Sequence, residues 1–319
     1  MCTAVSFRTK HHYFGRNLDL ERGYNEGVVI TPRNYPFAFR YVEPEENHYA
    51  LIGMATVVND YPLYFEATNE KGLSMAGLNF PENAFYGPYE ERKENIAPFE
   101  LIPYILGLFG TVKEVREALK NINVVHCNFS EELPVSPLHW MISDRELSVV
   151  LECTRDGMKV YDNPFCVLTN NPPFDYHLLH MNNFMGLHEG FAENRISQGT
   201  AFMNYSLGLG ALGLPGDFSS SSRFVKAVFV KEKSVCDGSE AESVNQFFHI
   251  LNAVAMPKGC VLTKAGEYEY TRYSCCCDTD IQVYYFTTYE NLSIRQVDMH
   301  AVDLDGAELY RYNKQKKEK

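Results

Sequence analysis

Segments of strand-forming character come in long consecutive blocks in this chain, and not one by one between helices. The expected strands cover residues 2–9, 12–19, 27–32, 37–41, 50–58, 63–68, 73–79, 138–143, 148–155, 157–161, 166–170, 268–276, 282–289 and 292–298. Strands that follow one another without an intervening helix pair as antiparallel neighbours. This pattern argues against a doubly wound parallel sheet.

Two helical blocks separate the strand blocks. The expected helices cover residues 98–108, 111–122, 174–186, 220–230 and 239–255. Thr111 with Glu114, and Ser239 with Glu242, have the spacing of capping boxes that begin helices. Apolar residues then recur at helical spacing, as on helices that cover a sheet. The pattern predicts an α+β fold in which helices cover antiparallel sheets.

No Gly-, Ser- or Pro-rich linker divides the chain, so we expect one domain over residues 1–319. The nearest candidate is the glycine-rich stretch LGLGALGLPGD at 207–217. It lacks the preceding strand, the lysine and the spacing of a nucleotide-binding loop. We therefore interpret it as a functional loop within the domain.

The second residue is a cysteine, in the opening stretch MCTAVSFRT. Removal of the initiator methionine would leave Cys2 with a free α-amino group. The residue would then carry a thiol with an ordinary pKa of about 8.5 and an α-amine with a pKa of about 7.7–8.0. The amine could accept the proton of the thiol. This is the arrangement of an N-terminal nucleophile. On position alone Cys2 could be incidental, and the interpretation depends on the rest of the chain.

The charge balance excludes one class of partner. The chain has 29 Lys and Arg against 41 Asp and Glu, a formal net charge of −12, so we expect no nucleic acid partner. The longest apolar stretch, 99–110, is too short to span a bilayer, and no secretion signal opens the chain. We therefore expect a cytoplasmic protein that binds no membrane.

The nine cysteines are an odd number and include no C-x-x-C pair, which indicates neither a disulfide framework nor a zinc site. Cys275, Cys276 and Cys277 are consecutive. Adjacent residues of a strand point to opposite faces, so these three cannot all converge on one ion. We expect no bound metal, and the role of the run stays open.

Six motifs, in order along the chain, resemble those of the choloylglycine hydrolase family, and most closely its bile salt hydrolases. They are MCTAVSF, FGRNLD, NEKGLSMAGLNFP, SPLHWMISD, LTNNPPFDY and LPGDFSSSSRF, and the similarity extends from Cys2 to about Asn313. The resemblance implies the αββα sandwich of the N-terminal nucleophile hydrolases and hydrolysis of a linear amide without a cofactor. It also suggests a homotetramer.

The resemblance also implies a set of catalytic residues: Cys2, Arg16, Asp19, Asn79, Asn171 and Arg223. Cys2 would be the nucleophile, Arg16 the cation that favours its thiolate, and Asp19 the carboxylate that binds its α-amine. A spacing of three places Arg16 and Asp19 on opposite faces of a regular strand. We therefore expect Asp19 to lie past the end of the strand.

Asn79 and Asn171 match the oxyanion-hole positions of the family, the first through its backbone N–H and the second through its side-chain amide. Arg223 matches the second active-site arginine. A cation in the first turn of a helix opposes the helix dipole, which favours a functional explanation for Arg223.

The substrate pocket implied by the resemblance is lined by Leu18, Tyr24, Val58, Phe65, Phe129 and Leu133. Apolar and aromatic walls suit a steroid, whose conjugated amino acid would leave a carboxylate or sulfonate facing solvent. The negative net charge repels such an anion at long range. Binding is therefore expected to depend on apolar burial and local arginines.

These features together predict an amidase that acts on conjugated bile salts. A penicillin V acylase, which shares the fold and the nucleophile, is the alternative. A nonenzymatic small-molecule binder is a third interpretation, against which the complete set of catalytic residues counts. The preference for glycine or taurine conjugates stays open.

Overall fold

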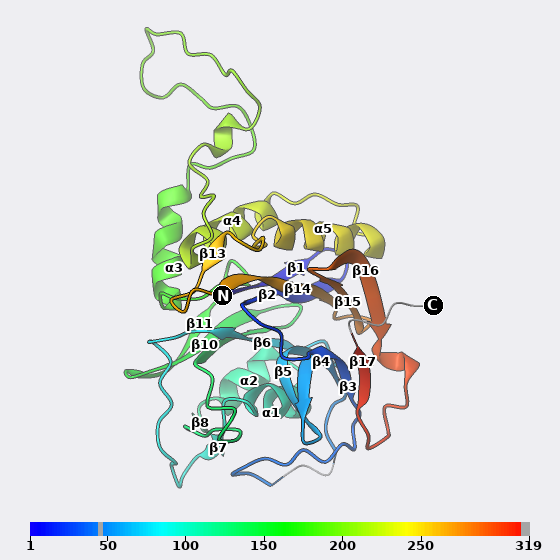
Figure 1. Ribbon diagram of the computed structural model, residues 1–319. Coiled ribbons are helices and arrows are strands. Elements are labelled where there is room, and N and C mark those ends of the chain that lie inside the picture. The colour runs from blue at the N-terminus through cyan, green and yellow to red at the C-terminus, as the bar shows by residue number, and fades with distance from the viewer. Residues whose placement is uncertain (44–46, 314–319) are drawn as a thin grey trace.

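The computed structural model describes residues 1–43 and 47–313. Two antiparallel sheets pack face to face, with helices on the outer face of each (Figure 1). This layer order confirms the predicted αββα sandwich. A single domain over residues 1–319 stays a prediction.

The first sheet has the strand order β12-β1-β2-β14-β15-β16, with β13 paired to β14. Its strands are β1 (Cys2–Arg8), β2 (His12–Leu20), β12 (Val167–Leu168), β13 (Val261–Leu262), β14 (Tyr268–Asp278), β15 (Val283–Thr288) and β16 (Asn291–Asp298). The hairpin of β1 and β2 expected at the start of the chain is therefore confirmed, and it lies inside the sheet.

The second sheet has the order β11-β10-β9-β6-β5-β4-β3-β17. Its strands are β3 (Gly27–Thr31), β4 (Leu51–Val58), β5 (Tyr61–Asn69), β6 (Ser74–Asn79), β9 (Leu138–Ser143), β10 (Ser148–Thr154), β11 (Gly157–Asp162) and β17 (Tyr310–Asn313). A short parallel pair, β7 (Glu94–Ile96) and β8 (Ile122–Val124), lies apart from both sheets.

Among the described residues, five α-helices form in the segments expected to be helical. They are α1 (Leu101–Leu108), α2 (Val112–Ala118), α3 (Phe174–His180), α4 (Ser220–Glu232) and α5 (Glu240–Asn252), with 3-10 turns η1 (Met181–Phe184), η2 (Leu209–Ala211) and η3 (Met299–Ala301). Thr111 and Glu114 form the expected capping box, and the Ser239 side chain accepts from the backbone N–H of Glu242. Figure 1 shows α4 and α5 over the first sheet and α1 and α2 under the second.

Strands β3 and β4 of the second sheet are apolar on both faces because both of their faces are covered. Val28 and Ile30 of β3 belong to the core between the sheets, whereas Val29 belongs to the core under α1 and α2. In β4, Ile52 belongs to the core between the sheets and Leu51 to the core under α1 and α2. This alternation with period two explains why the segments read as continuous apolar runs in the sequence.

Several sequence predictions of local structure differ from the structure, including the helices expected to reach 122 and 186, where α2 ends at Ala118 and α3 at His180. Residues 37–41 form no strand; Phe37 packs instead on Phe39 and His48, with ring centroids 5.6 and 4.9 Å away. Alternating aromatic residues resemble a strand, but here their rings form an aromatic cluster. The helix expected from 98 begins at Leu101, after a turn. The short strands β7, β8, β13 and β17 were not predicted.

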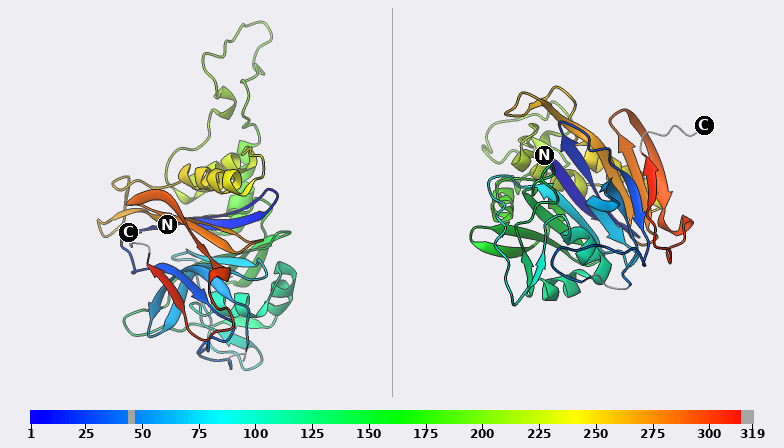
Figure 2. Two further views of the ribbon diagram at one scale, coloured as in Figure 1. Left: turned by 90° about the vertical axis from the view of Figure 1, so that its right-hand side faces the viewer. Right: turned by 60° about the horizontal axis from the view of Figure 1, so that its bottom comes forward.

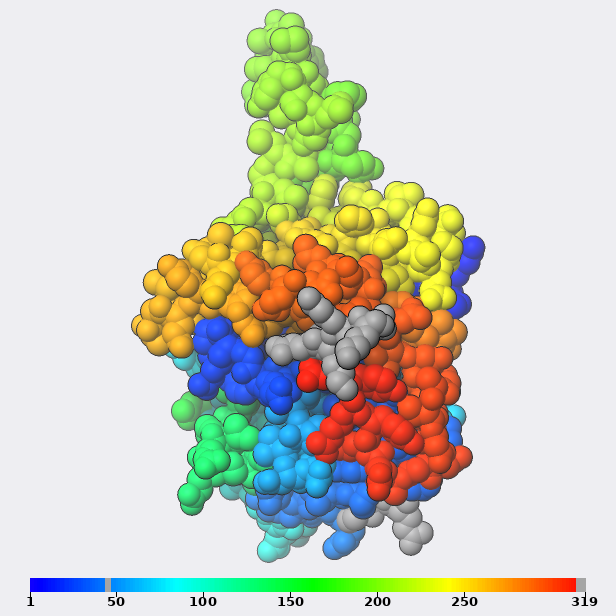
Figure 3. Space-filling model, turned by 45° about the vertical axis from the view of Figure 1, so that its right-hand side comes forward, coloured from blue at the N-terminus to red at the C-terminus, as the bar shows by residue number. Residues whose placement is uncertain are grey.

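A long irregular segment, residues 185–217, leaves the body between α3 and α4; we call it the arm. Figure 1 and Figure 2 show it extending away from the two sheets, and it stands clear of the surface in Figure 3. It includes the glycine-rich stretch 207–217. That stretch is therefore a loop, as predicted, and it projects well beyond the layers.

The three consecutive cysteines alternate between the faces of β14, as predicted. All three are buried, and the thiol of Cys275 points to the second sheet, where it contacts Glu66 Oε1 at 3.5 Å. Within residues 1–43 and 47–313, no group of His, Cys, Asp or Glu side chains is arranged to hold a metal ion. The run therefore contributes to the core.

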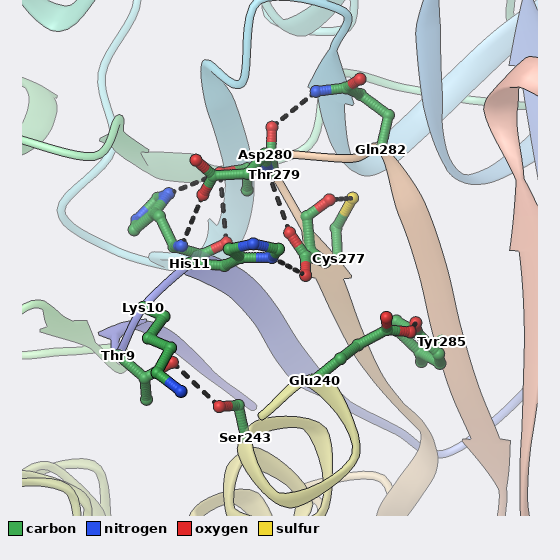
Figure 4. A network of polar contacts seen from close by, with 12 residues as sticks. Thr9, Lys10, His11, Glu240, Ser243, Cys277, Thr279, Asp280, Gln282 and Tyr285 are labelled. Carbon is green, nitrogen blue, oxygen red and sulfur yellow. Dashed lines mark hydrogen bonds and ion pairs between the residues drawn. The ribbon is translucent and has the colours of Figure 1, made fainter. Parts of the chain in front are cut away.

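The hairpin of β1 and β2 is anchored at its tip, far along the strands from Cys2 (Figure 4). His11 Nδ1 lies 2.7 Å from Asp278 Oδ2, and Thr9 Oγ1 lies 2.9 Å from Ser243 Oγ of α5. The hydrogen bond to Asp278 raises the pKa of His11. These contacts tie the strand that begins with Cys2 to β14 and to the helical layer.

Candidate active site

Strand register places Cys2 beside two of the predicted site residues. Cys2 lies opposite Leu18, and Ala4 lies opposite Arg16 in the β1–β2 pair. Opposed residues and alternate residues of a strand share a face, so the side chains of Cys2, Leu18 and Arg16 all point toward the second sheet. Cys2 is 2% exposed and Arg16 is fully buried.

Arg16 extends into the place where β5 and β6 separate. Its Nη1 donates to the carbonyl oxygens of Phe65 and Gly77, at 3.0 and 2.6 Å. Its Nη2 is buried and has no hydrogen-bond partner in the part of the chain that the structure describes. Burial by itself lowers the Arg16 pKa, but nearby negative charges, Cys2 first, raise it above its ordinary value. The guanidinium is therefore a permanent cation beside the thiol.

Asp19 lies within β2, so the prediction that it follows the end of the strand is wrong. The register of β2 with β14 shifts between Thr271 and Tyr273, and this bulge lets the pairing continue past Asp19. Asp19 Oδ1 accepts from the Thr271 hydroxyl at 2.6 Å, and Oδ2 is buried without a partner among the described residues. Burial raises the pKa of Asp19, and the positive charge of Arg223 opposes that shift.

Arg16 and Asp19 do lie on opposite faces of the strand. The side chain of Cys2 points to the Arg16 side, whereas the negative charge of Asp19 acts on the α-amine of Met1. The α-amine of Met1 donates to the Asp19 carbonyl oxygen at 2.8 Å and forms an ion pair with Glu269. Asp19 therefore lies beside the beginning of the first strand.

Asn170, and not Asn171, is the asparagine that contacts Cys2. The side-chain oxygen of Asn170 accepts from the Cys2 backbone nitrogen at 2.8 Å, and its amide nitrogen donates to the Asn79 carbonyl oxygen at 2.7 Å. The amide of Asn171 turns away and donates to the Pro81 carbonyl oxygen at 2.7 Å. Because β12 ends at Leu168, strand alternation could not distinguish the two adjacent asparagines in the sequence.

Arg223 reaches the same cluster from the first turn of α4. Its Nη1 donates to the Cys2 carbonyl oxygen and, at 2.7 Å, to Thr3 Oγ1. Its Nη2 donates to Asn170 Oδ1 at 2.7 Å. Burial lowers the pKa of Arg223. The position predicted for Arg223 is thus beside Cys2, where the arginine fixes the orientation of the Asn170 amide.

His177 holds Asn170 from behind, a contact that no sequence motif indicated. Its Nε2 lies 2.9 Å from the Asn170 carbonyl oxygen, and burial lowers the pKa of this imidazole to about 4. The ring is therefore neutral near pH 7, and its Nε2–H donates to Asn170. The Asn170 backbone N–H in turn donates to Ser220 Oγ at 2.8 Å.

Asn79 is the last residue of β6, and on the β5 side its backbone has no strand partner in the described part of the chain. The next residue, Phe80, donates its N–H to the β9 side, so the N–H and C=O of Asn79 point the other way. On that edge β5 pairs with β6 only as far as Ala76, and Arg16 fills the gap beyond. The Asn79 carbonyl accepts from Asn170 there, which places its N–H at the same edge.

A cleft of about 490 Å³ opens over Cys2 between the two sheets and the loop before β9. Five of the six predicted substrate residues line it: Leu18, Tyr24, Phe65, Phe129 and Leu133. Val58 is the exception: the lining stops at Thr56 on that strand, and Val58 lies at the tip of the β4–β5 hairpin. Sequence reasoning missed Pro98, Phe99 and Ile102, which belong to the same wall.

Within the described residues, no helix combines the length and the apolar character needed to cross a membrane.

The site consists of a buried cysteine at the start of a strand, two buried arginines, two asparagines and a mostly apolar cleft. Such a set suits nucleophilic attack on a carbonyl group within an apolar substrate.

Comparison with known proteins agrees with this chemistry. Residues 2–312 match the family described as linear amide C–N hydrolases, choloylglycine hydrolase family. A bile salt hydrolase/transferase of Lactiplantibacillus plantarum is 51% identical over 98% of this chain and 96% of that protein. A bile salt hydrolase/transferase of Clostridium perfringens is 39% identical over 98% of each chain.

Solved structures agree with the fold. The C2A mutant of the conjugated bile acid hydrolase from Clostridium perfringens superposes with a TM-score of 0.90 at 38% identity, covering 98% of this chain and 96% of that one. Penicillin V acylase from Agrobacterium tumefaciens gives a TM-score of 0.77 at 19% identity, covering 98% and 91%, and shows the shared fold alone.

The fold and the comparisons define an enzyme of the N-terminal nucleophile hydrolase architecture that cleaves linear amides. The chain belongs to the choloylglycine hydrolase family.

Proposed function

We propose that this protein hydrolyses the amide bond of glycine- or taurine-conjugated bile salts, with Cys2 as an N-terminal nucleophile. The observation that carries the proposal is the position of Cys2 in the wall of an apolar cleft of about 490 Å³, a size within the range of small-molecule sites. The names of the relatives, bile salt hydrolase/transferase and conjugated bile acid hydrolase, support the same substrate class.

The first step needs a free amine on Cys2, which removal of Met1 would supply. The Asn170 side-chain oxygen, 2.8 Å from the Cys2 nitrogen, and the unpartnered Asp19 Oδ2 would then accept hydrogen bonds from that amine. The thiol proton moves to the amine, and the sulfur, stabilised as thiolate by Arg16, attacks the amide carbon.

Attack places a negative charge on the former carbonyl oxygen. We assign its stabilisation to the backbone N–H of Asn79 and to the side-chain amide of Asn170. One N–H of that amide donates to the Asn79 carbonyl oxygen, and the second N–H is available for the oxyanion. The protonated α-amine then gives its proton to the departing nitrogen as the C–N bond breaks. Water hydrolyses the resulting thioester, which releases the bile acid and regenerates the thiol.

We expect conjugated bile salts to be hydrolysed with a higher kcat/KM than penicillin V. The long apolar wall from Leu18 to Phe129 and Leu133 suits a steroid, whereas the penicillin side chain would cover less of it. Initial rates for a glycine conjugate, a taurine conjugate and penicillin V, followed by amine or product release, give the comparison.

A preference for penicillin V would reverse this order in favour of the acylase alternative. If the protein binds bile salts but hydrolyses none of the three compounds, while iodoacetamide still modifies Cys2, the nonenzymatic binder is the correct description.

We further propose that the protein acts in the cytoplasm as a homotetramer whose arms contact neighbouring copies. Ile196, Met203 and Leu207 of the arm are 91%, 82% and 82% exposed, an unusual density of apolar surface for a segment that stands clear of the body (Figure 3). Sedimentation equilibrium should give four times the chain mass of 36.5 kDa. A monomeric mass at micromolar concentration would contradict this assembly.

A further inference from the structure

Glu66 of β5 is a buried carboxylate that lies between the two sheets and outside the predicted catalytic set. Its side chain is 2% exposed. Oε2 accepts from the Tyr273 hydroxyl at 2.7 Å and Oε1 from the Tyr284 hydroxyl at 2.6 Å. The Cys275 thiol lies 3.5 Å from Oε1, and the Met54 backbone N–H lies 3.3 Å from it. A side chain with this many partners is held in one position.

The neighbours of Glu66 are arranged for its charged form. Two hydroxyls, a thiol and a backbone N–H all donate toward it, and an ionised carboxylate is an acceptor only. Burial raises the pKa of Glu66, and the Arg16 charge together with the hydroxyl donors opposes that shift. Four donors around one buried carboxyl group match the requirement that a buried charge be paired and hydrogen-bonded.

The remaining partner of Glu66 is Arg16. Oε2 lies 3.9 Å from Arg16 Nε, and the adjacent Phe65 carbonyl oxygen accepts from Arg16 Nη1 at 3.0 Å. Two consecutive residues of β5 therefore contact two of the three guanidinium nitrogens, and Nε also donates to the Asn17 carbonyl oxygen at 3.4 Å. The third nitrogen, Nη2, has no protein partner among the described residues, and Arg16 and Cys2 both line the cleft.

An arginine side chain has several rotatable bonds, so fixing it in one position costs rotamer entropy. Carbonyl oxygens alone neutralise none of the guanidinium charge, and an uncompensated buried charge favours movement toward water. A fixed carboxylate behind the guanidinium removes both problems.

We propose that Glu66 is a positioning residue that holds Arg16 beside the Cys2 sulfur. This inference rests on the proposed role of Cys2 as nucleophile and assigns to Glu66 no contact with substrate. Tyr273, Tyr284 and Cys275 in turn hold Glu66, which explains why polar side chains of β14 and β15 converge between the sheets.

The negative charge of Glu66 and its positioning of Arg16 have opposite effects on the pKa of the Cys2 thiol. A negative charge near the thiol disfavours thiolate, so its removal alone would lower the Cys2 thiol pKa. Loss of a well-placed Arg16 would raise that pKa. The sign of the change therefore separates positioning from simple electrostatics.

Glu66→Gln keeps the shape and removes the charge. We expect the pH profile of Cys2 alkylation by iodoacetamide, read by peptide mass spectrometry, to shift upward by about one pH unit, a tenfold loss of thiolate below both pKa values. The kcat/KM for a glycine-conjugated bile salt should fall about tenfold, in step with the loss of thiolate below both pKa values. KM should change little.

Tyr284→Phe removes one of the hydrogen bonds that hold the same carboxylate but keeps the charge of Glu66, so its alkylation profile should shift in the same direction by less than that of Glu66→Gln. Glu66→Asp retains the charge and should restore part of the reactivity. If circular dichroism shows that Glu66→Gln does not fold, Glu66→Asp provides the test. Its alkylation profile should shift to higher pH by less than about one unit, because the shorter side chain holds Arg16 less firmly.

An alkylation profile of Glu66→Gln that is unchanged, or that moves to lower pH, overturns the positioning role. Because alkylation needs no substrate, this result is distinct from failure of the proposed function, which would appear as absence of bile salt hydrolysis in the wild-type protein.

Discussion

Cys2→Ser lowers kcat for conjugated bile salts by about 10³-fold or more in our account, with the fold intact. A hydroxyl is far less acidic than a thiol, and an α-amine is too weak a base to remove its proton efficiently. Losses of this size follow when the nucleophile of a hydrolase is removed. Steady-state amine release at saturating substrate measures the effect, and circular dichroism checks the fold.

Cys260→Ser is the matched control, since Cys260 is exposed and lies outside the cleft lining. Its kcat should equal that of the wild type. Turnover by Cys2→Ser within tenfold of wild type would place the nucleophile elsewhere.

Asn170→Ala should lower kcat about 10²- to 10³-fold, the loss found when a side-chain donor to an oxyanion is removed. The variant also removes the acceptor of the Cys2 nitrogen and of Arg223 Nη2, at 2.8 and 2.7 Å. KM should change less, because the donor acts on charge that develops only in the transition state.

The adjacent Asn171→Ala is a close control, because that side chain donates to the Pro81 carbonyl oxygen and not to the Cys2 cluster. It should retain kcat within a few-fold. Asn79→Ala keeps the backbone N–H assigned to the oxyanion and should lose less than Asn170→Ala. A larger loss in Asn171→Ala than in Asn170→Ala would reverse the assignment drawn from the structure.

Much of this architecture could be predicted because local signals agreed with the tertiary fold. The capping box at Thr111 and the Ser239 cap begin helices where expected. The apolar runs of β3 and β4 are strands because both faces of their sheet are covered. The strand predicted at 37–41 does not form because Phe37 and Phe39 pack on each other and on Tyr104 of α1 and take no part in strand pairing.

The site predictions failed where the answer depended on contacts between distant segments. Asp19 stays in β2 because of a bulge in β14, some 250 residues away in the chain, which no local pattern of β2 reveals. Asn170 and Asn171 have equal local chemistry, and only the positions of Cys2 and Arg223 distinguish them. Val58 was predicted to line the cleft, but the part of β4 that lines the cleft ends two residues earlier, at Thr56.

The most direct test of Cys2 as an N-terminal nucleophile is rapid-quench intact-mass spectrometry of the active protein with a conjugated bile salt. Our account predicts that the resting protein lacks the mass of Met1. During turnover a fraction should gain the mass of one bile acyl group on the N-terminal cysteine, as a thioester. A fully active preparation that retains Met1, or an acyl group on any other residue, would contradict the account.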